Sequence, residues 1–351
     1  WWRWLGLDLS TYFAGKNNMD QTEPNNAIVT KKQSKFRLSP PMIALILALI
    51  LFLLSGLLPN GFKTFSMALN QGLNILRLAS FIAIIGAGQT LVIISGSEGI
   101  DLSAGSVVTV GALMTYMFID GSNSLILPIL LVVLAMGAVV GLINGLGIMF
   151  LKISPFVMTL GMAGVVQGAL ILWTKGYYDG EVAPIMTQII ARDLWFDIPG
   201  MIYVWVLIGI LMTLLLTRTR YGKQLFAIGV NRQTARLSGV KVTRMVVVTY
   251  VLAGALAAFS GFLLVSYTQN AGPNLGNQYL FPSIIAVAIG GTQMSGGKGS
   301  YFGTIAGAIV IQLITSLLTT MQLPQALQQI IFGSLLLVIL VIYGRNKNLR
   351  V

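Results

Sequence analysis

The sequence contains no cysteine and no histidine, and only 9% of its 351 residues are charged. These absences exclude disulfides, thiol nucleophiles and imidazole acid–base catalysis, and they remove the usual ligands of a zinc site. A serine protease triad and an HExxH metalloprotease are excluded for the same reason, and no pair of membrane-embedded aspartates is present for aspartyl chemistry. The sequence therefore predicts a protein that is not an enzyme, with no catalytic residue, no metal site and no cofactor bound by this chain.

What the chain has instead is apolar sequence: hydrophobic residues make up 56% of it, whereas an ordinary soluble domain is roughly a quarter charged. Several apolar runs approach the ~20 residues that a bilayer-spanning helix requires. The runs lie at about 42–58, 73–97, 104–120, 125–151, 155–173, 201–217, 246–267, 282–293, 301–320 and 325–343. We expect an all-α fold, a polytopic transmembrane helical bundle with about ten membrane crossings.

The net charge of +12 comes largely from three basic segments that adjoin apolar runs. They lie at 31–37, at 218–244, where seven Lys or Arg occur without an acidic residue, and at 345–350. The positive-inside rule assigns such segments to the cytoplasm. Six runs separate the first two segments and four separate the last two, so both termini are expected to be cytoplasmic and the loop 174–200 outside. This arrangement favours topological anchoring over nucleic-acid binding.

Two segments, 95–106 and 290–300, interrupt the apolar runs with glycine, serine and charge. Irregular backbone at membrane depth is tolerated only where protein or a water-filled cavity satisfies its polar groups. The two Gly-rich broken segments therefore point to a translocation path, and the alternative is a pair of tight cytoplasmic turns.

The loop 220–240, Arg-Tyr-Gly-Lys-Gln-Leu-Phe-Ala-Ile-Gly-Val-Asn-Arg-Gln-Thr-Ala-Arg-Leu-Ser-Gly-Val, is similar to the cytoplasmic loop of the ribose-type sugar ABC transporter permeases. Residues 99–106 resemble that family's signature after its early spans, and residues 290–304 resemble its later glycine-rich stretch. The resemblance covers about 42–344. It implies the membrane-spanning permease subunit of a binding-protein-dependent importer, which moves a ribose-like monosaccharide or a sugar alcohol across a bacterial inner membrane.

The resemblance also implies partners: two ATPase subunits, a periplasmic sugar-binding protein, and a second permease subunit that is either a copy of this chain or a different one. ATP is expected to be used by the partner, because the nearest approach to a P-loop, around Gly297 and Lys298, fails at both ends of the motif. Membrane lipid surrounds such a protein. The expected domains are a polar cytoplasmic tail at 1–41, a transmembrane permease domain at 42–344 with a coupling loop at 218–244, and a basic cytoplasmic tail at 345–351. Met19 is an alternative start, which would leave residues 1–18 upstream.

Within the loop, Asn231 is a good helix N-cap and Gly239 a good helix stop, so a short helix of about two turns is expected between them. The resemblance implies that this segment docks into a groove of the ATPase. The positions assigned to docking and shape are Gly222, Ala227, Gly229, Asn231, Ala235, Leu237 and Gly239. Arg232 and Arg236 are either docking contacts or topology determinants.

Sugar hydroxyls are matched by amides and hydroxyls without the cost of desolvating a charge. The substrate-pathway candidates beside the two Gly-rich segments are Gln89, Thr90, Asp101, Ser103, Thr292 and Gln293. Each has helix packing as its alternative role, and Asp101 and Glu98 have capping of the next helix. Many family members carry acidic residues where this chain has Leu280 and Pro282, which leaves the sugar open.

The second function considered is an ion- or proton-coupled secondary transporter of a small polar solute. Such transporters commonly bury ionisable residues that bind or relay the coupling ion. The apolar runs here hold little beyond Arg77, with Glu98 and Asp101 at a break. The sequence therefore favours the ABC importer.

Overall fold

The computed structural model of the chain describes residues 39–57 and 62–345. The predicted N-terminal tail, with the first basic segment, lies outside the described residues, as does all of the C-terminal tail beyond residue 345.

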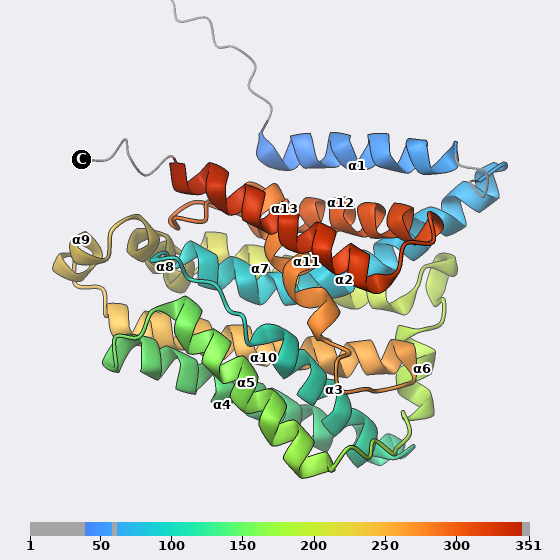
Figure 1. Cartoon of the computed structure of the whole chain (residues 1–351), viewed down its shortest axis with the longest axis horizontal. Coiled ribbons are helices and arrows are strands. Elements are labelled where there is room, and N and C mark those ends of the chain that lie inside the picture. Colours follow the sequence, from blue (N-terminus) through green and yellow to red (C-terminus); the bar gives the residue numbers. More distant parts are fainter. Residues whose placement is uncertain (1–38, 58–61, 346–351) are drawn as a thin grey trace, which may run out of the picture. The chain divides into compact units, whose positions relative to one another are not determined.

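Helices make up nearly all of the described secondary structure. The described residues contain no β-strand, only an isolated β-bridge between Asp193 and Pro199. Figure 1 shows most of the long helices running side by side. The helices are α1 (Pro40–Gly56), α2 (Phe65–Ile94), α3 (Ala104–Ile119), η3 (Asn123–Leu125), α4 (Ile126–Phe150), α5 (Pro155–Thr174), α6 (Pro184–Ile190), η4 (Trp195–Asp197), α7 (Gly200–Arg218), α8 (Arg220–Val230), α9 (Arg232–Leu237), α10 (Val242–Thr268), α11 (Asn277–Ile289), α12 (Tyr301–Thr320) and α13 (Gln325–Arg345).

Each of the ten predicted apolar runs coincides with one of these helices. Six helices, α2, α4, α5, α7, α10 and α12, are long and apolar enough to cross a membrane. The other four, α1, α3, α11 and α13, are shorter apolar helices over their described residues. The start of α2 differs from the prediction. The helix begins at Phe65 rather than near residue 73, because the Thr64 side chain caps it there by accepting the Met67 amide.

The interior of the bundle is formed by α2 and α10. The most apolar window of α2 is 89% buried within the chain and that of α10 is 61% buried, against 22% for α4 and for α5. Glycines bring α4 against α10: a Cβ built on Gly141 would lie 2.0 Å from the carbonyl oxygen of Tyr250, and one on Gly137 would lie 2.3 Å from that of Gly254. Only glycine permits this approach, which is how small residues serve helix packing in membranes. The exposed apolar faces of α4 and α5 are left for lipid.

Candidate functional site

A polar hollow of about 370 Å³ lies between α2, α11, α12 and α13. None of its fifteen lining residues is charged, and most carry an amide or a hydroxyl group. The lining residues are Asn74, Leu78, Ile82, Gln278, Tyr279, Pro282, Gln312, Thr315, Ser316, Thr319, Thr320, Gln325, Gln328, Gln329 and Phe332. Amides and hydroxyls both donate and accept hydrogen bonds, so this lining suits a neutral ligand rich in hydroxyl groups.

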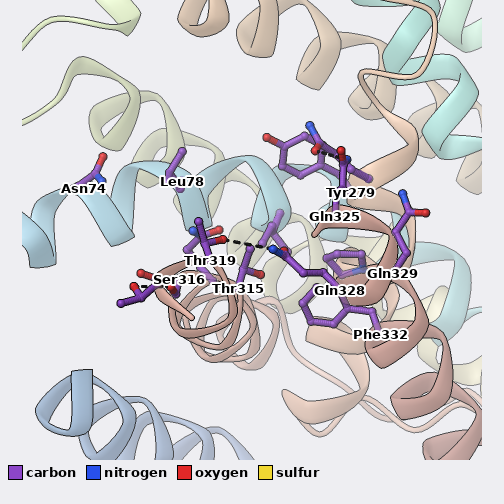
Figure 2. Close-up of a pocket in the computed structure, with 15 residues that line it drawn as sticks. Asn74, Leu78, Tyr279, Thr315, Ser316, Thr319, Gln325, Gln328, Gln329 and Phe332 are labelled. Atoms are coloured by element: carbon purple, nitrogen blue, oxygen red, sulfur yellow. Dashed lines mark hydrogen bonds between the residues drawn. The ribbon is translucent and has the colours of Figure 1, made fainter. Parts of the chain in front are cut away.

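Helical spacing places the polar groups of this hollow. Thr315, Ser316 and Thr319 lie on one face of α12, and Gln325, Gln328 and Gln329 lie in the first turns of α13, because residues three and four apart share a helix face. Figure 2 shows Gln328 reaching from α13 toward Thr319, where its Nε2 donates to the Thr319 hydroxyl at 3.4 Å. The aromatic ring of Phe332 and the ring of Tyr279 contribute apolar surface beside them.

An amide pair separates this hollow from a second one. Gln325 Nε2 donates to Gln278 Oε1 at 3.0 Å, and both residues also line a neighbouring hollow of about 400 Å³ beside the connection from α10 to α11. We call these two residues the amide pair. The amide pair therefore lies where the two hollows adjoin.

This hollow is not among the sites predicted from the sequence. None of the six predicted pathway residues lines it: Gln89, Thr90, Asp101, Ser103, Thr292 and Gln293. The available signal was the recurrence of Thr, Ser and Gln at helical spacing in the two last apolar runs. Of the lining residues, the sequence singles out Pro282 alone, as a position where many members of the resembled family carry an acidic residue.

Three of the predicted pathway residues instead belong to one buried network. Gln89 Nε2 donates to the Asp101 carbonyl at 2.6 Å, and the Asp101 amide donates back to Gln89 Oε1 at 3.3 Å. The Asp101 carboxylate accepts from the Ser103 amide and hydroxyl, and Asn144 Nδ2 donates to the same hydroxyl at 2.9 Å. These side chains are between 0% and 2% exposed. They hold the non-helical segment 95–103 against α2 and α4.

The other three predicted pathway residues are dispersed. Thr90 is paired with Thr304 of α12, with their hydroxyl oxygens 2.7 Å apart. Thr292 and Gln293 lie in the non-helical segment 290–300. Thr292 is fully buried there, and the backbone N–H of Gln293 donates to the Lys298 carbonyl. A role for any of the six in the substrate path stays a prediction.

The two Gly-rich segments meet each other and α8. The Gly297 amide donates to the Ile94 carbonyl at 3.0 Å. A Cβ on Gly229 would lie 1.9 Å from that carbonyl oxygen and 2.3 Å from the Gly297 nitrogen, and one on Gly96 would lie 3.0 Å from the Gly229 Cα. Backbone therefore packs directly on backbone at Gly96, Gly229 and Gly297, which we call the glycine junction.

The predicted short helix is present as α9, six residues long. Asn231 caps it by accepting the Thr234 amide at 3.0 Å. Gly239 ends it at φ +83°, and the next amide, of Val240, donates to the Ala235 carbonyl. The eleven-residue α8 before it was not predicted; Thr219 caps α8 by accepting the Gly222 amide.

The seven predicted coupling residues divide by exposure. Ala227, Asn231, Leu237 and Gly239 are exposed, with Leu237 83% exposed. The remaining three, Gly222, Gly229 and Ala235, face the protein. The exposed set is available for a partner, whereas the inward set shapes the loop.

One further contact fixes the loop to α10. The Thr249 hydroxyl donates to the Met245 carbonyl, so the Tyr221 hydroxyl, 2.8 Å from Thr249, is the donor of that pair. Burial raises the pKa of Tyr221 to about 12. Arg232 is partly buried, and this burial lowers its pKa. Its role, as a docking contact or a topology determinant, stays a prediction.

Residues 71–340 match the family of branched-chain amino acid transport system permease components. The ribose import permease protein RbsC of Bacillus subtilis (strain 168) is 34% identical over 280 residues, which cover 79% of this chain and 85% of that protein. The fructose import permease protein FrcC of Rhizobium meliloti is 31% identical over 347 residues, covering 94% and 91%. The autoinducer 2 import system permease protein LsrC of Escherichia coli O9:H4 (strain HS) is 29% identical, covering 88% and 89%. No solved structure matches this chain.

Six helices long and apolar enough to cross a membrane, with four shorter apolar helices, define the described part of the chain as a multi-pass membrane protein. The chain belongs to the family of transport system permease components that its residues 71–340 match. The predicted resemblance to sugar import permeases is confirmed by these relatives.

Proposed function

We propose that this chain is the permease subunit of an ABC importer that carries a ribose-like monosaccharide or a sugar alcohol across the inner membrane. The observation that carries the proposal is the polar hollow, because its amide and hydroxyl lining matches sugar hydroxyls without burying a charge. The printed names of the relatives, import permeases for ribose and fructose, support the same substrate class.

In the proposed topology all ten apolar helices cross the membrane and both termini are cytoplasmic. The glycine junction, α8 and α9 then lie at the cytoplasmic face. The acidic loop 174–200 lies outside, where Asp193 forms an ion pair with Arg77 of α2 at 2.6 Å. The hollow opens toward the same outer side, since its residues come from the first half of α2, the end of α12 and the start of α13.

Transport follows by alternating access in this proposal. A binding protein delivers the sugar at the outer face, and two ATPase subunits contact the exposed coupling residues Ala227, Asn231 and Leu237. Movement of α8 passes through Gly229 to Ile94 at the end of α2, and through Gly297 to α12. The distance along α2 from Ile94 to Ile82 in the hollow is about 18 Å at 1.5 Å per residue. A second permease subunit, either a copy or a different chain, completes the pathway.

The proposal is tested by reconstituting this chain with its ATPase subunits and binding protein in liposomes. Uptake of labelled ribose, a labelled sugar alcohol and a labelled branched-chain amino acid is measured with and without ATP. We expect ATP-dependent uptake of a sugar or sugar alcohol. Uptake of the amino acid alone, or uptake that follows an ion gradient without ATP, would contradict the proposal.

A further inference from the structure

A third hollow, of about 540 Å³, lies at the opposite end of the bundle from the polar hollow, between the end of α4, α9 and the start of α10. Apolar groups form most of its surface, among them Leu146 and Phe150 of α4 and Val247 of α10, which we call its apolar side. Arg236, Lys241 and Arg244 also line it and are called its basic side. No acidic residue lines it.

The apolar side continues along α4 into the part of the helix that faces lipid. Five exposed apolar residues each lie three or four positions from another of the set, which places them on one face of the helix. They are Val139, Leu142, Ile143, Leu146 and Phe150, and between 39% and 66% of each side chain is exposed. This stripe leads directly from the membrane-facing surface into the hollow.

The basic side stands where the stripe ends. Arg236, Lys241 and Arg244 are all exposed, so each can turn its charge toward a ligand. They belong to a loop of seven basic residues that contains no carboxylate. The hollow therefore joins an acyl-chain track to a cluster of positive charge, the arrangement expected where an anionic lipid meets a protein at the membrane surface.

We propose that this hollow binds an anionic phospholipid of the inner leaflet, with its phosphate among Arg236, Lys241 and Arg244 and one acyl chain along α4. The leaflet follows from the topology under the proposed function. The lipid is preferred over a docked ATPase because the apolar stripe reaches the hollow from the lipid-facing surface of α4, whereas the exposed coupling residue Leu237 does not line it.

The test measures lipid binding to the purified chain by native mass spectrometry, without sugar or ATPase, so that failure of the transport proposal cannot affect it. Phosphatidylglycerol is compared with phosphatidylcholine of the same acyl chains, and with glycerophosphoglycerol, which carries the phosphate without acyl chains. We expect retention of phosphatidylglycerol only. Retention of the chainless compound at similar affinity would overturn the lipid assignment.

The variant R236Q/K241Q/R244Q should bind phosphatidylglycerol on the order of a hundredfold more weakly, since each basic residue near an anionic surface contributes separately. The matched control R218Q/R220Q/K223Q removes the same three charges from the same loop but from outside the hollow, and it should bind like the parent protein. Both membrane faces are accessible in detergent, so a change of insertion orientation cannot mimic the result. Equal loss in both variants, or release of the lipid when the ATPase subunits are added, would overturn the proposal.

Discussion

The hydroxyl oxygens of Thr90 and Thr304 lie 2.7 Å apart, although 214 residues separate them along the chain. Thr90 donates its hydrogen to the Gly86 carbonyl at 2.7 Å, whereas the other acceptor near the Thr304 hydroxyl, the Ser300 carbonyl, is 3.5 Å away. The shorter bond assigns Thr304 as the donor between the two threonines. Both side chains are fully buried. This bond joins α2 to α12, the two helices that connect the polar hollow with the glycine junction, and the Tyr301 hydroxyl adds a second one by donating to the Ala83 carbonyl at 3.1 Å.

Replacing Thr304 with Val should therefore loosen the contact between α2 and α12. Interhelical hydrogen bonds in membrane proteins contribute roughly 0.6 kcal/mol on average, so we expect a small decrease in thermal stability in detergent. The variants T90V, T304V and the double variant form a cycle that isolates the pair. Additive effects of the two single substitutions would show that the bond contributes nothing.

Gln312 tests the polar hollow, because it lines the hollow and is only 6% exposed. Its replacement by Leu should raise the KM for sugar uptake about tenfold, the equivalent of about 1.4 kcal/mol for a lost hydrogen bond. The comparison is Gln89→Leu, which breaks both backbone contacts to Asp101 and should lower the amount of folded protein. If Gln89→Leu raises KM while Gln312→Leu leaves it unchanged, the substrate path runs beside the Gly-rich segments instead.

The amide pair is expected to control passage between the two hollows. Gln325→Ala removes the 3.0 Å bond to Gln278 and leaves an open connection. We expect faster exchange of bound sugar with the outer solution, measured by binding kinetics in proteoliposomes. Ser334→Ala, also on α13 but lining neither hollow, is the control, and equal exchange rates in the two variants would remove the gating role.

Gly229 tests transmission through the glycine junction. A methyl group there must displace the Ile94 carbonyl or the Gly297 amide, so Gly229→Ala should reduce uptake per ATP hydrolysed by about fivefold or more. Gly164→Ala is the control, since nothing lies within 4 Å of a Cβ at that position.

Gly239 tests the shape of α9 without a steric contribution, because a Cβ there would meet nothing within 4 Å. Its φ of +83° disfavours a β-branched residue by about 1–2 kcal/mol. Gly239→Val should therefore reduce co-purification of the ATPase and sugar uptake, while Gly239→Asn, which tolerates this conformation, should preserve both. Wild-type transport by Gly239→Val with the ATPase bound would mean that the loop is only a tether.

Local signals in the sequence were enough for the helices and for α9. Apolar runs predict helices because a chain in lipid must satisfy its backbone hydrogen bonds internally, and all ten runs are helical. Asn231 and Gly239 act through their own backbone and their near neighbours, so the ends of α9 could be predicted from sequence. The predicted start of α2 is too late because Ser66, Asn70, Gln71 and Asn74 interrupt the apolar sequence of its first turns.

The sequence by itself determined the class of the protein, its helices and the shape of its basic loop, since each depends on composition or on residues a few positions apart. The tertiary structure alone decided which polar residues share a hollow. Gln278 meets Gln325 across 47 residues, and Gly96 meets Gly229 and Gly296 across more than a hundred. Such pairs form through helix packing, and helical periodicity shows which face of a helix a residue occupies but not which other helix will cover that face.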